Sequence, residues 1–245
     1  MTLESRARSR RGDGMSAMEA VAWLGGERLS QSPRCVSRVL AGFVESCNDR
    51  WPDAERQLLK PYVPLIVGTR SGPAVEHRRA YVLTDRAVRA WALFAAHSAG
   101  SLARQWGGAI RAQAEKLAAV ELLGDSRSAL RAAAVAFATA DEIQAVADLV
   151  EFCALDDNTV AGAHADAHAL AAEAVRSAAY AAQALAAGAT YTAATAATAA
   201  VEATEATGLA AAYADGASAA PFTREETVAQ SLNAVEALLA PVAWA

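Results

Sequence analysis

Apolar residues recur every three or four positions along most of this chain, which is the spacing of amphipathic α-helices. After Pro33, for example, five such residues predict one buried helix face: Val36, Val39, Leu40, Phe43 and Val44. The strict alternation that is typical of half-buried strands is not sustained anywhere in the sequence. The pattern therefore predicts an all-α fold, an irregular bundle or stack of about 8–10 helices with no sheet.

Glycine, proline and capping residues predict where the longer helices begin and end. A long helix is expected from Pro73 to about Ala99, because proline suits the first turn of a helix. Farther along the chain, separate helices are expected over 127–139, 141–155 and 191–207, the last of them closed by Gly208.

Alanine dominates the second half of the chain and fills 40 of the 90 positions from 131 to 220. It is the best intrinsic helix former and lets helix axes approach closely. It also contributes little apolar area, so we expect a thin core. Composition then predicts three parts: a disordered, Arg-rich leader over 1–16, an Arg-rich helical part over 17–124, and an alanine-rich acidic bundle over 125–245.

Charge is distributed unevenly between these parts. Residues 1–131 hold 20 basic and 13 acidic residues, a balance of +7, whereas residues 132–222 hold one and eleven, a balance of −10. Four arginines of the expected long helix share one face: Arg78, Arg79, Arg86 and Arg89. This face is interpreted as solvated or docked on the acidic half, with an acidic partner as the alternative. No aromatic-basic stripe or zinc motif accompanies it, so nucleic-acid binding is not expected.

The cysteines and one long uncharged segment indicate where in the cell the protein is expected to lie. Cys35, Cys47 and Cys153 form no C-x-x-C pair and are interpreted as reduced thiols of a cytoplasmic protein. The 25 residues from Ser177 to Val201 carry no charge, but alanine, threonine and glutamine make them too polar for a membrane span. We therefore expect a cytoplasmic protein that does not enter the membrane.

The segment ESCNDRWPDAERQLLKPYVPLIVGTR, residues 45–70, resembles the pattern LNDxLPDxxRQxLKPxxPxLVGTR of a family of uncharacterised proteins from high-GC bacteria. In that family the segment also precedes an alanine-rich helical region. Cys47 stands where leucine is usual, and Trp51 stands where a smaller apolar residue is. The resemblance implies a helical architecture and carries no assigned activity.

This segment also holds the densest group of polar side chains in the chain. The hypothesis is a binding site on its loops, because loops commonly carry binding groups. The candidate residues are Asn48, Asp49, Arg56, Lys60, Thr69 and Arg70. Free amides of the loop 68–72, ahead of a helix, would suit an anion. The alternative is structural, with Asn48 capping a helix and Arg56 paired with a neighbouring acid.

His164 and His168 are four residues apart and would share one helix face. This spacing places two imidazoles on one metal in some proteins, with Asp157 or Glu173 as a third ligand here. The glutamate of the H-E-x-x-H motif is missing, however. We therefore expect structural or exposed histidines and no metal or other cofactor.

None of the catalytic motifs with a strong spacing requirement occurs in the sequence: no G-x-S-x-G elbow, no P-loop and no dinucleotide-binding glycine pattern. The leading hypothesis is a non-enzymatic helical interaction or scaffolding module, regulatory or immunity-like, that binds a protein partner or a second copy. The alternatives are a small-ligand or anion-binding helical protein and a metal-dependent enzyme that uses His164 and His168.

Overall fold

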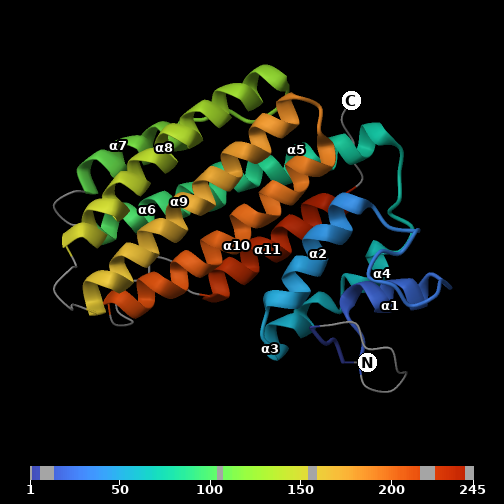
Figure 1. Ribbon diagram of the computed structural model, residues 1–245. Helices are drawn as coiled ribbons and strands as arrows, with labels where there is room; N and C mark the ends of the chain where they lie inside the picture. The colour runs from blue at the N-terminus through green and yellow to red at the C-terminus, as the bar shows by residue number, and fades with distance from the viewer. Residues whose placement is uncertain (1, 6–13, 104–106, 154–158, 216–223, 241–245) are drawn as a thin grey trace. The chain divides into compact units, whose positions relative to one another are not determined.

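The computed structural model describes residues 2–5, 14–103, 107–153, 159–215 and 224–240. Throughout these ranges the regular structure is helical, and the one β-type feature is an isolated bridge between Leu3 and Met15. Figure 1 shows the helices in chain order. The prediction of an all-α, multi-helix fold is confirmed.

The chain divides into two compact units. Unit 1 comprises residues 1–82 and 228–245, and unit 2 comprises residues 83–227. This division differs from the boundary at 124/125 that composition suggests. The reason is that the helices after residue 83 pack on the alanine-rich helices. They bring large side chains such as Leu83, Ile110 and Leu117, which the alanine helices lack.

Unit 1 is built from short helices around a core of large side chains. Its elements are α1 (Ala17–Leu24), α2 (Arg38–Arg50), α3 (Asp53–Arg56), the 3₁₀ turn η1 (Gln57–Leu59), α4 (Val63–Ile66), most of α5 (Pro73–Arg86) and most of α11 (Arg224–Leu239). All five residues of the apolar face expected after Pro33 are buried, but only four of them lie on a helix, because α2 begins at Arg38 and Val36 precedes it.

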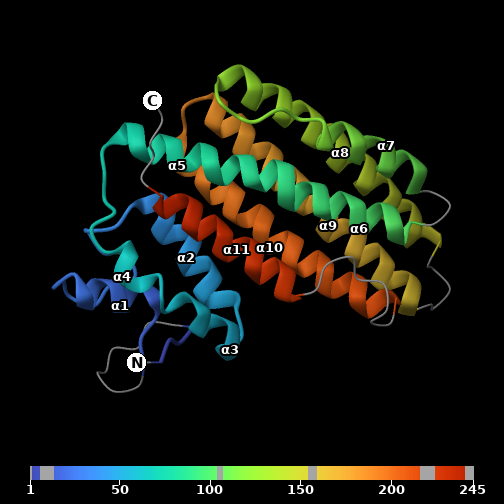
Figure 2. The same ribbon diagram turned by 180° about the vertical axis from the view of Figure 1, so that it is seen from behind.

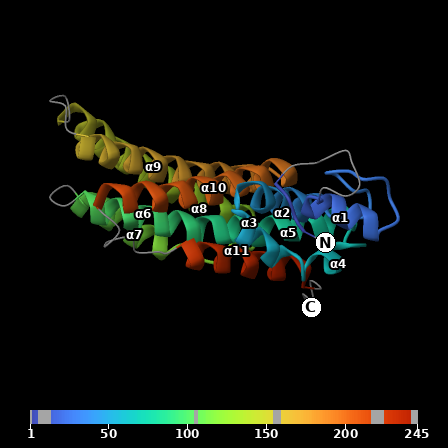
Figure 3. The same cartoon turned by 90° about the horizontal axis from the view of Figure 1, so that it is seen from below.

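Unit 2 consists of longer helices. It contains η2 (Ala87–Ala92), α6 (Leu93–Leu102), α7 (Gly107–Ala118), α8 (Ser126–Cys153), α9 (Thr159–Ala186) and α10 (Thr190–Asp215). Figure 2 shows α6 beside α9, and Figure 3 shows α9 running alongside α10. The facing sides of these helices are mostly alanine, as at Ala193, Ala197 and Ala200 of α10, so little side chain separates the axes.

Two expected helix boundaries are absent from the structure, and one expected helix has a different interior. α8 continues through Ala140 and Asp141, where two helices were expected, and α10 continues through Gly208 to Asp215. A single glycine costs a helix about 1 kcal/mol and does not end it when the flanking residues are strong helix formers. The expected long helix from Pro73 does form, but its middle, η2, is a π-helix.

The uncharged segment from Ser177 to Val201 is divided between two helices. Gly188 lies between α9 and α10 with a φ of +76°, a conformation that glycine adopts without strain. Within the part of the chain that the structure describes, no helix is both long enough and apolar enough to cross a bilayer.

Candidate functional site

Asn48, the first candidate binding residue, lies buried at the end of α2 in unit 1. Its Oδ1 accepts a hydrogen bond from the Ala17 amide at 3.0 Å, which satisfies the first turn of α1. Its Nδ2 donates to the Glu4 carbonyl at 2.9 Å and to Asp49 Oδ1 at 3.1 Å. Both amide hydrogens of Asn48 are therefore used inside the chain.

Arg56 is buried next to Asn48 and also serves the fold. Its Nε donates to the Asn48 carbonyl at 2.6 Å, and its Nη2 donates to the Trp51 carbonyl at 2.5 Å. Its Nη1 forms an ion pair with Asp53 at 2.5 Å. The structure brings Asn48 and Arg56 together, in the arrangement that the structural alternative described.

The adjacent Gln57 fixes the described part of the leader. Its side chain accepts from the Leu3 amide at 3.0 Å and donates to the Leu3 carbonyl at 2.9 Å. The Leu3 side chain is buried, and Ser16 caps α1. Residues 2–5 and 14–16 thus differ from the expected disordered leader, while residues 6–13 lie outside the described residues.

The other candidate binding residues are more accessible. Asp49 and Arg70 are exposed, and Lys60 is half-buried. In the loop 68–72, the Thr69 amide donates to the Ile66 carbonyl at 3.2 Å, and the Arg70 amide donates to the Cys35 carbonyl at 2.9 Å. Both amides therefore already donate hydrogen bonds within the chain and are not available to bind an anion.

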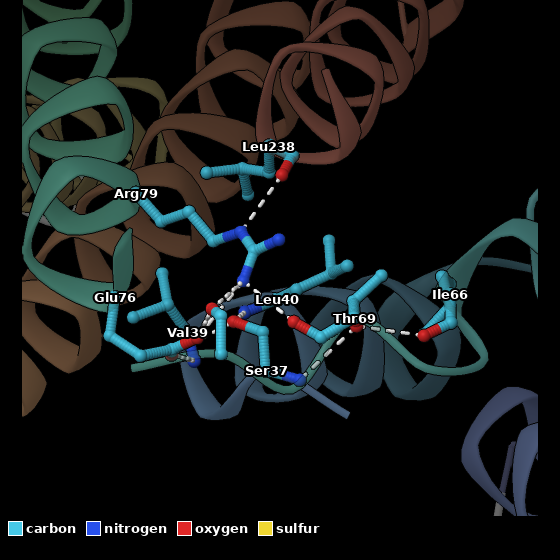
Figure 4. Close-up of polar contacts among 9 residues, drawn as sticks. Ser37, Val39, Leu40, Ile66, Thr69, Glu76, Arg79 and Leu238 are labelled. Carbon is cyan, nitrogen blue, oxygen red and sulfur yellow. Dashed lines mark hydrogen bonds and ion pairs between the residues drawn. The ribbon is translucent and has the colours of Figure 1, made fainter. Parts of the chain in front are cut away.

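A buried ion pair between Glu76 and Arg79 forms the centre of a polar cluster (Figure 4). The Glu76 carboxylate accepts from the Ser37 hydroxyl at 2.9 Å and from the Val39 amide at 3.4 Å. Since Ser37 is the N-cap of α2, a negative charge lies at the N-terminus of this helix. Carboxylates stabilise such a terminus because its amides carry partial positive charge.

Arg79 completes the cluster with complementary contacts. Its Nη1 lies 3.0 Å from Glu76 Oε1 and also donates to the Thr69 carbonyl and the Ser71 hydroxyl, each at 2.9 Å. Its Nε donates to the Leu238 carbonyl at 3.0 Å, in the last turn of α11. The cation thus satisfies a helix C-terminus, whose carbonyls lack partners within the helix.

Arg79 was expected on one face with Arg78, Arg86 and Arg89, either solvated or docked on the acidic half. It is not solvated, because it is buried in this cluster with Glu76 as its ionic partner. Glu76 was not among the residues expected at a site. Their spacing of three residues in the first two turns after Pro73 was the available signal, since side chains at i and i+3 meet on a helix.

His164 and His168 lie on α9 but are not arranged as a pair of metal ligands. His168 is buried, with Nδ1 2.6 Å from the His164 carbonyl and Nε2 3.1 Å from the Ala99 carbonyl of α6. Both ring nitrogens thus face backbone oxygens. Of the two other suggested ligands, Glu173 is exposed and Asp157 lies outside the described residues. Among the described residues, no three His, Cys, Asp or Glu side chains gather as a metal would need.

Large apolar side chains are exposed at the C-terminal end of α1, in the loop that follows it, and on α4. Trp23, Leu24 and Leu29 are 52%, 47% and 37% exposed, and Leu65 of α4 is 60% exposed. α1 and α4 contact each other in unit 1, as Figures 1 and 2 both show. We call these four residues the Trp23 surface.

The Trp23 surface is held in place by its own backbone. Gly26, with a φ of +73°, ends α1, and the Glu27 amide donates to the Ala22 carbonyl at 2.9 Å. The Glu27 carboxylate accepts from the amides of Arg34 and Cys35 at 2.7 and 2.8 Å, which closes the following loop. These amide contacts also hold the pKa of Glu27 below its usual range.

The polar clusters of unit 1 thus connect parts of the fold, whereas the four apolar side chains of the Trp23 surface remain exposed. The Trp23 surface was not expected, because single exposed leucines cannot be told from core residues before the fold is known. No family model, curated protein or solved structure gives a significant match to this chain.

Proposed function

We propose that this protein is a non-enzymatic helical interaction protein that binds a partner protein through the Trp23 surface. The observation that carries the proposal is the exposure of Trp23 and Leu24 at the end of α1 and of Leu29 in the loop that follows, which hydrogen bonds of Glu27 close. Exposed apolar groups that gather on one side of a protein commonly mark interaction sites.

Tryptophan supports this assignment more strongly than leucine does. Tryptophan is among the residues that contribute most to binding energy at protein interfaces, and its ring loses little conformational entropy when it is covered. Because the loop after α1 is already closed by Glu27, ordering it on binding adds little further cost. A rigid apolar surface of this kind suits an apolar helix or loop of another protein.

The buried polar groups support a scaffolding role for the rest of unit 1. Asn48 and Arg56 hold α1 and the end of α2, while Glu76 and Arg79 hold α2 and α11. Their side chains are engaged in fixing helix ends, which favours interaction over the alternative of anion or small-ligand binding. The amides of Thr69 and Arg70 already donate hydrogen bonds within the chain, which also disfavours anion binding at this loop.

A cytoplasmic location forms part of the proposal. Cys35 and Cys47 are not joined in a disulfide, as is usual in reducing compartments. Burial raises the pKa of the Cys35 thiol, which keeps it protonated and less reactive.

Photocrosslinking in the cells that naturally produce the protein tests the proposal. A photoreactive phenylalanine analogue is placed at position 23, and a second variant carries it at Tyr180 of α9, which is also exposed. We expect a discrete adduct from position 23 that is lost when Leu65→Glu is added. Identical adducts from both positions, or none from position 23, would contradict the proposed binding surface.

A further inference from the structure

α8 in unit 2 has one face that is not covered by its neighbours. The helix packs against α7 and α9, and Figure 1 shows it at the edge of this group of helices. Three large apolar side chains project from the uncovered face: Leu130, Leu149 and Phe152, which are 55%, 40% and 72% exposed. At the helical angle per residue they share an arc of about 100°.

Small residues occupy the middle of the same face. Ala134, Ala138 and Ala145 are all exposed and lie between Leu130 and Leu149. They leave room for a second helix to approach closely, with the leucines at either end of the contact. Alanines alone define no site, but here the face also carries an ordered set of charges.

These charges are segregated along the helix. Arg127 and Arg131 lie in the first two turns, whereas Asp141 and Asp148 lie in the second half, all four exposed on the same face. This order is opposite to the one that stabilises an isolated helix, which favours anions near the N-terminus and cations near the C-terminus. The order does suit a partner helix that runs in the opposite direction and carries the same sequence.

We propose that the exposed face of α8 binds α8 of a second copy of this chain, with the two helices antiparallel about a twofold axis. A register centred between residues 139 and 140 places Leu130 opposite the partner's Leu149. The same register places Arg131 opposite the partner's Asp148, and Ala134 opposite the partner's Ala145. Arg127 then meets the aromatic ring of the partner's Phe152, a cation–π arrangement.

The exposed face of α8 is complementary to itself, which favours a second copy of this chain as its binding partner. A twofold interface must match its own surface, so each contact occurs twice. Leucine meets leucine, alanine meets alanine and arginine meets aspartate in one register. The present contacts of the charged groups are exposed and therefore weak: Arg131 pairs with Glu121 at 2.9 Å, and Asp148 accepts from Gln144 at 2.8 Å. Both can exchange partners on association.

The expected affinity follows from the size of the face. From Arg127 to Phe152 the helix spans about 38 Å. A single pair of helices with alanine in the centre falls at the small end of specific interfaces, so the dissociation constant should lie roughly in the micromolar range. This association uses unit 2 and goes beyond the proposed partner binding by the Trp23 surface.

Sedimentation velocity on the full chain, from about 1 to 200 μM, tests the proposal. We expect a concentration-dependent monomer–dimer equilibrium for the unaltered protein. Arg131→Asp alone and Asp148→Arg alone should each weaken it about tenfold or more, because each brings like charges together. The double variant, Arg131→Asp with Asp148→Arg, restores the opposite-charge pairs and should return the dissociation constant to within about threefold of the original.

Controls keep the result specific to α8. Circular dichroism checks that each variant is folded, and Leu149→Lys provides a second way to disrupt the contact. Leu209→Lys on α10, another exposed leucine, should leave the equilibrium unchanged. The proposal is overturned if the protein is a monomer at every concentration, or if the single charge reversals leave the dissociation constant unchanged. It is also overturned if the double variant does not regain the original dissociation constant. Trp23→Ala should leave self-association unchanged, which separates this test from that of the proposed function.

Discussion

In unit 1, the Nη1 atom of Arg79 lies 3.0 Å from Glu76 Oε1, with both side chains buried. The carboxylate lies at the N-terminus of α2, and the guanidinium binds the Leu238 carbonyl near the C-terminus of α11. Each charge is thus stabilised by the other and by a helix end. Removing either one leaves a buried charge without its partner, which is the costly way to break an ion pair.

We predict that Arg79→Ala lowers the free energy of unfolding by about 3–5 kcal/mol, as measured by urea denaturation of the full chain. Arg89→Ala is the matched control, because Arg89 forms an i,i+4 pair with Asp85 in the same continuous helical segment but is exposed. Arg89→Ala should lower the free energy of unfolding by only about 0–1 kcal/mol. Equal losses for the two variants would show that the buried cluster contributes no more than a surface pair.

The leader gives a second prediction. Leu3 is buried and its backbone pairs with Gln57 in both directions, so Leu3→Ala should lower the free energy of unfolding by about 2 kcal/mol or more. Leu58→Ala, at an exposed position of η1, should change it by no more than about 0.5 kcal/mol. If thermal unfolding of the Leu3 variant matches that of the unaltered protein, the packing of residues 2–5 is not part of the stable fold.

The contact between α6 and α7 predicts opposite effects for two neighbouring glycines. A Cβ on Gly107 would lie 2.2 Å from the Gly100 carbonyl oxygen, whereas a Cβ on Gly108 would meet nothing within 4 Å. Gly107→Ala should therefore destabilise the protein by about 1–3 kcal/mol, because backbone must move. Gly108→Ala should be neutral or stabilise it by up to about 1 kcal/mol, because alanine favours the helix. Differential scanning calorimetry distinguishes the two, and similar shifts in Tm would contradict the close approach.

His168 predicts a pH dependence. Burial lowers the pKa of His168 from its ordinary value of 6.5, although the carbonyls of His164 and Ala99 oppose the shift. The unfolded chain therefore binds the proton at higher pH than the folded chain does. The stability that depends on neutral His168 is present above about pH 6.5 and is lost as the pH falls below it.

Urea denaturation at pH 7.5 and at pH 5.5, about one unit above and one unit below the ordinary pKa of histidine, measures this effect. The His168→Gln variant is the reference. The unaltered protein should lose more free energy of unfolding between the two pH values than the variant does. An equal loss in both proteins would assign the acid sensitivity to other groups.

Local pattern was sufficient to predict the helices but not their partners. The face of α2 from Val39 to Val44 follows from apolar spacing, which is a property of a few neighbouring residues. The continuation of α10 through Gly208 depends instead on the summed helix propensity of the residues around it, which no single residue shows.

The candidate binding residues show where sequence reasoning ends. Asn48 and Arg56, and also Arg79 of the expected arginine face, have side chains that suit either ligand recognition or the capping of helix ends. Choosing between these roles requires knowing that the Ala17 amide and the Leu238 carbonyl lie beside them. Those contacts span 31 and 159 residues of chain, so no local pattern contains them.

Isothermal titration calorimetry of the partner captured at position 23 tests the central claim, binding through the Trp23 surface, most directly. The account predicts that Trp23→Ala weakens the affinity about 30-fold or more, as for a residue at the centre of an interface. Phe152→Ala, which removes an exposed aromatic ring from unit 2, should change it less than about threefold. Equal affinities for Trp23→Ala and the unaltered protein would contradict the account.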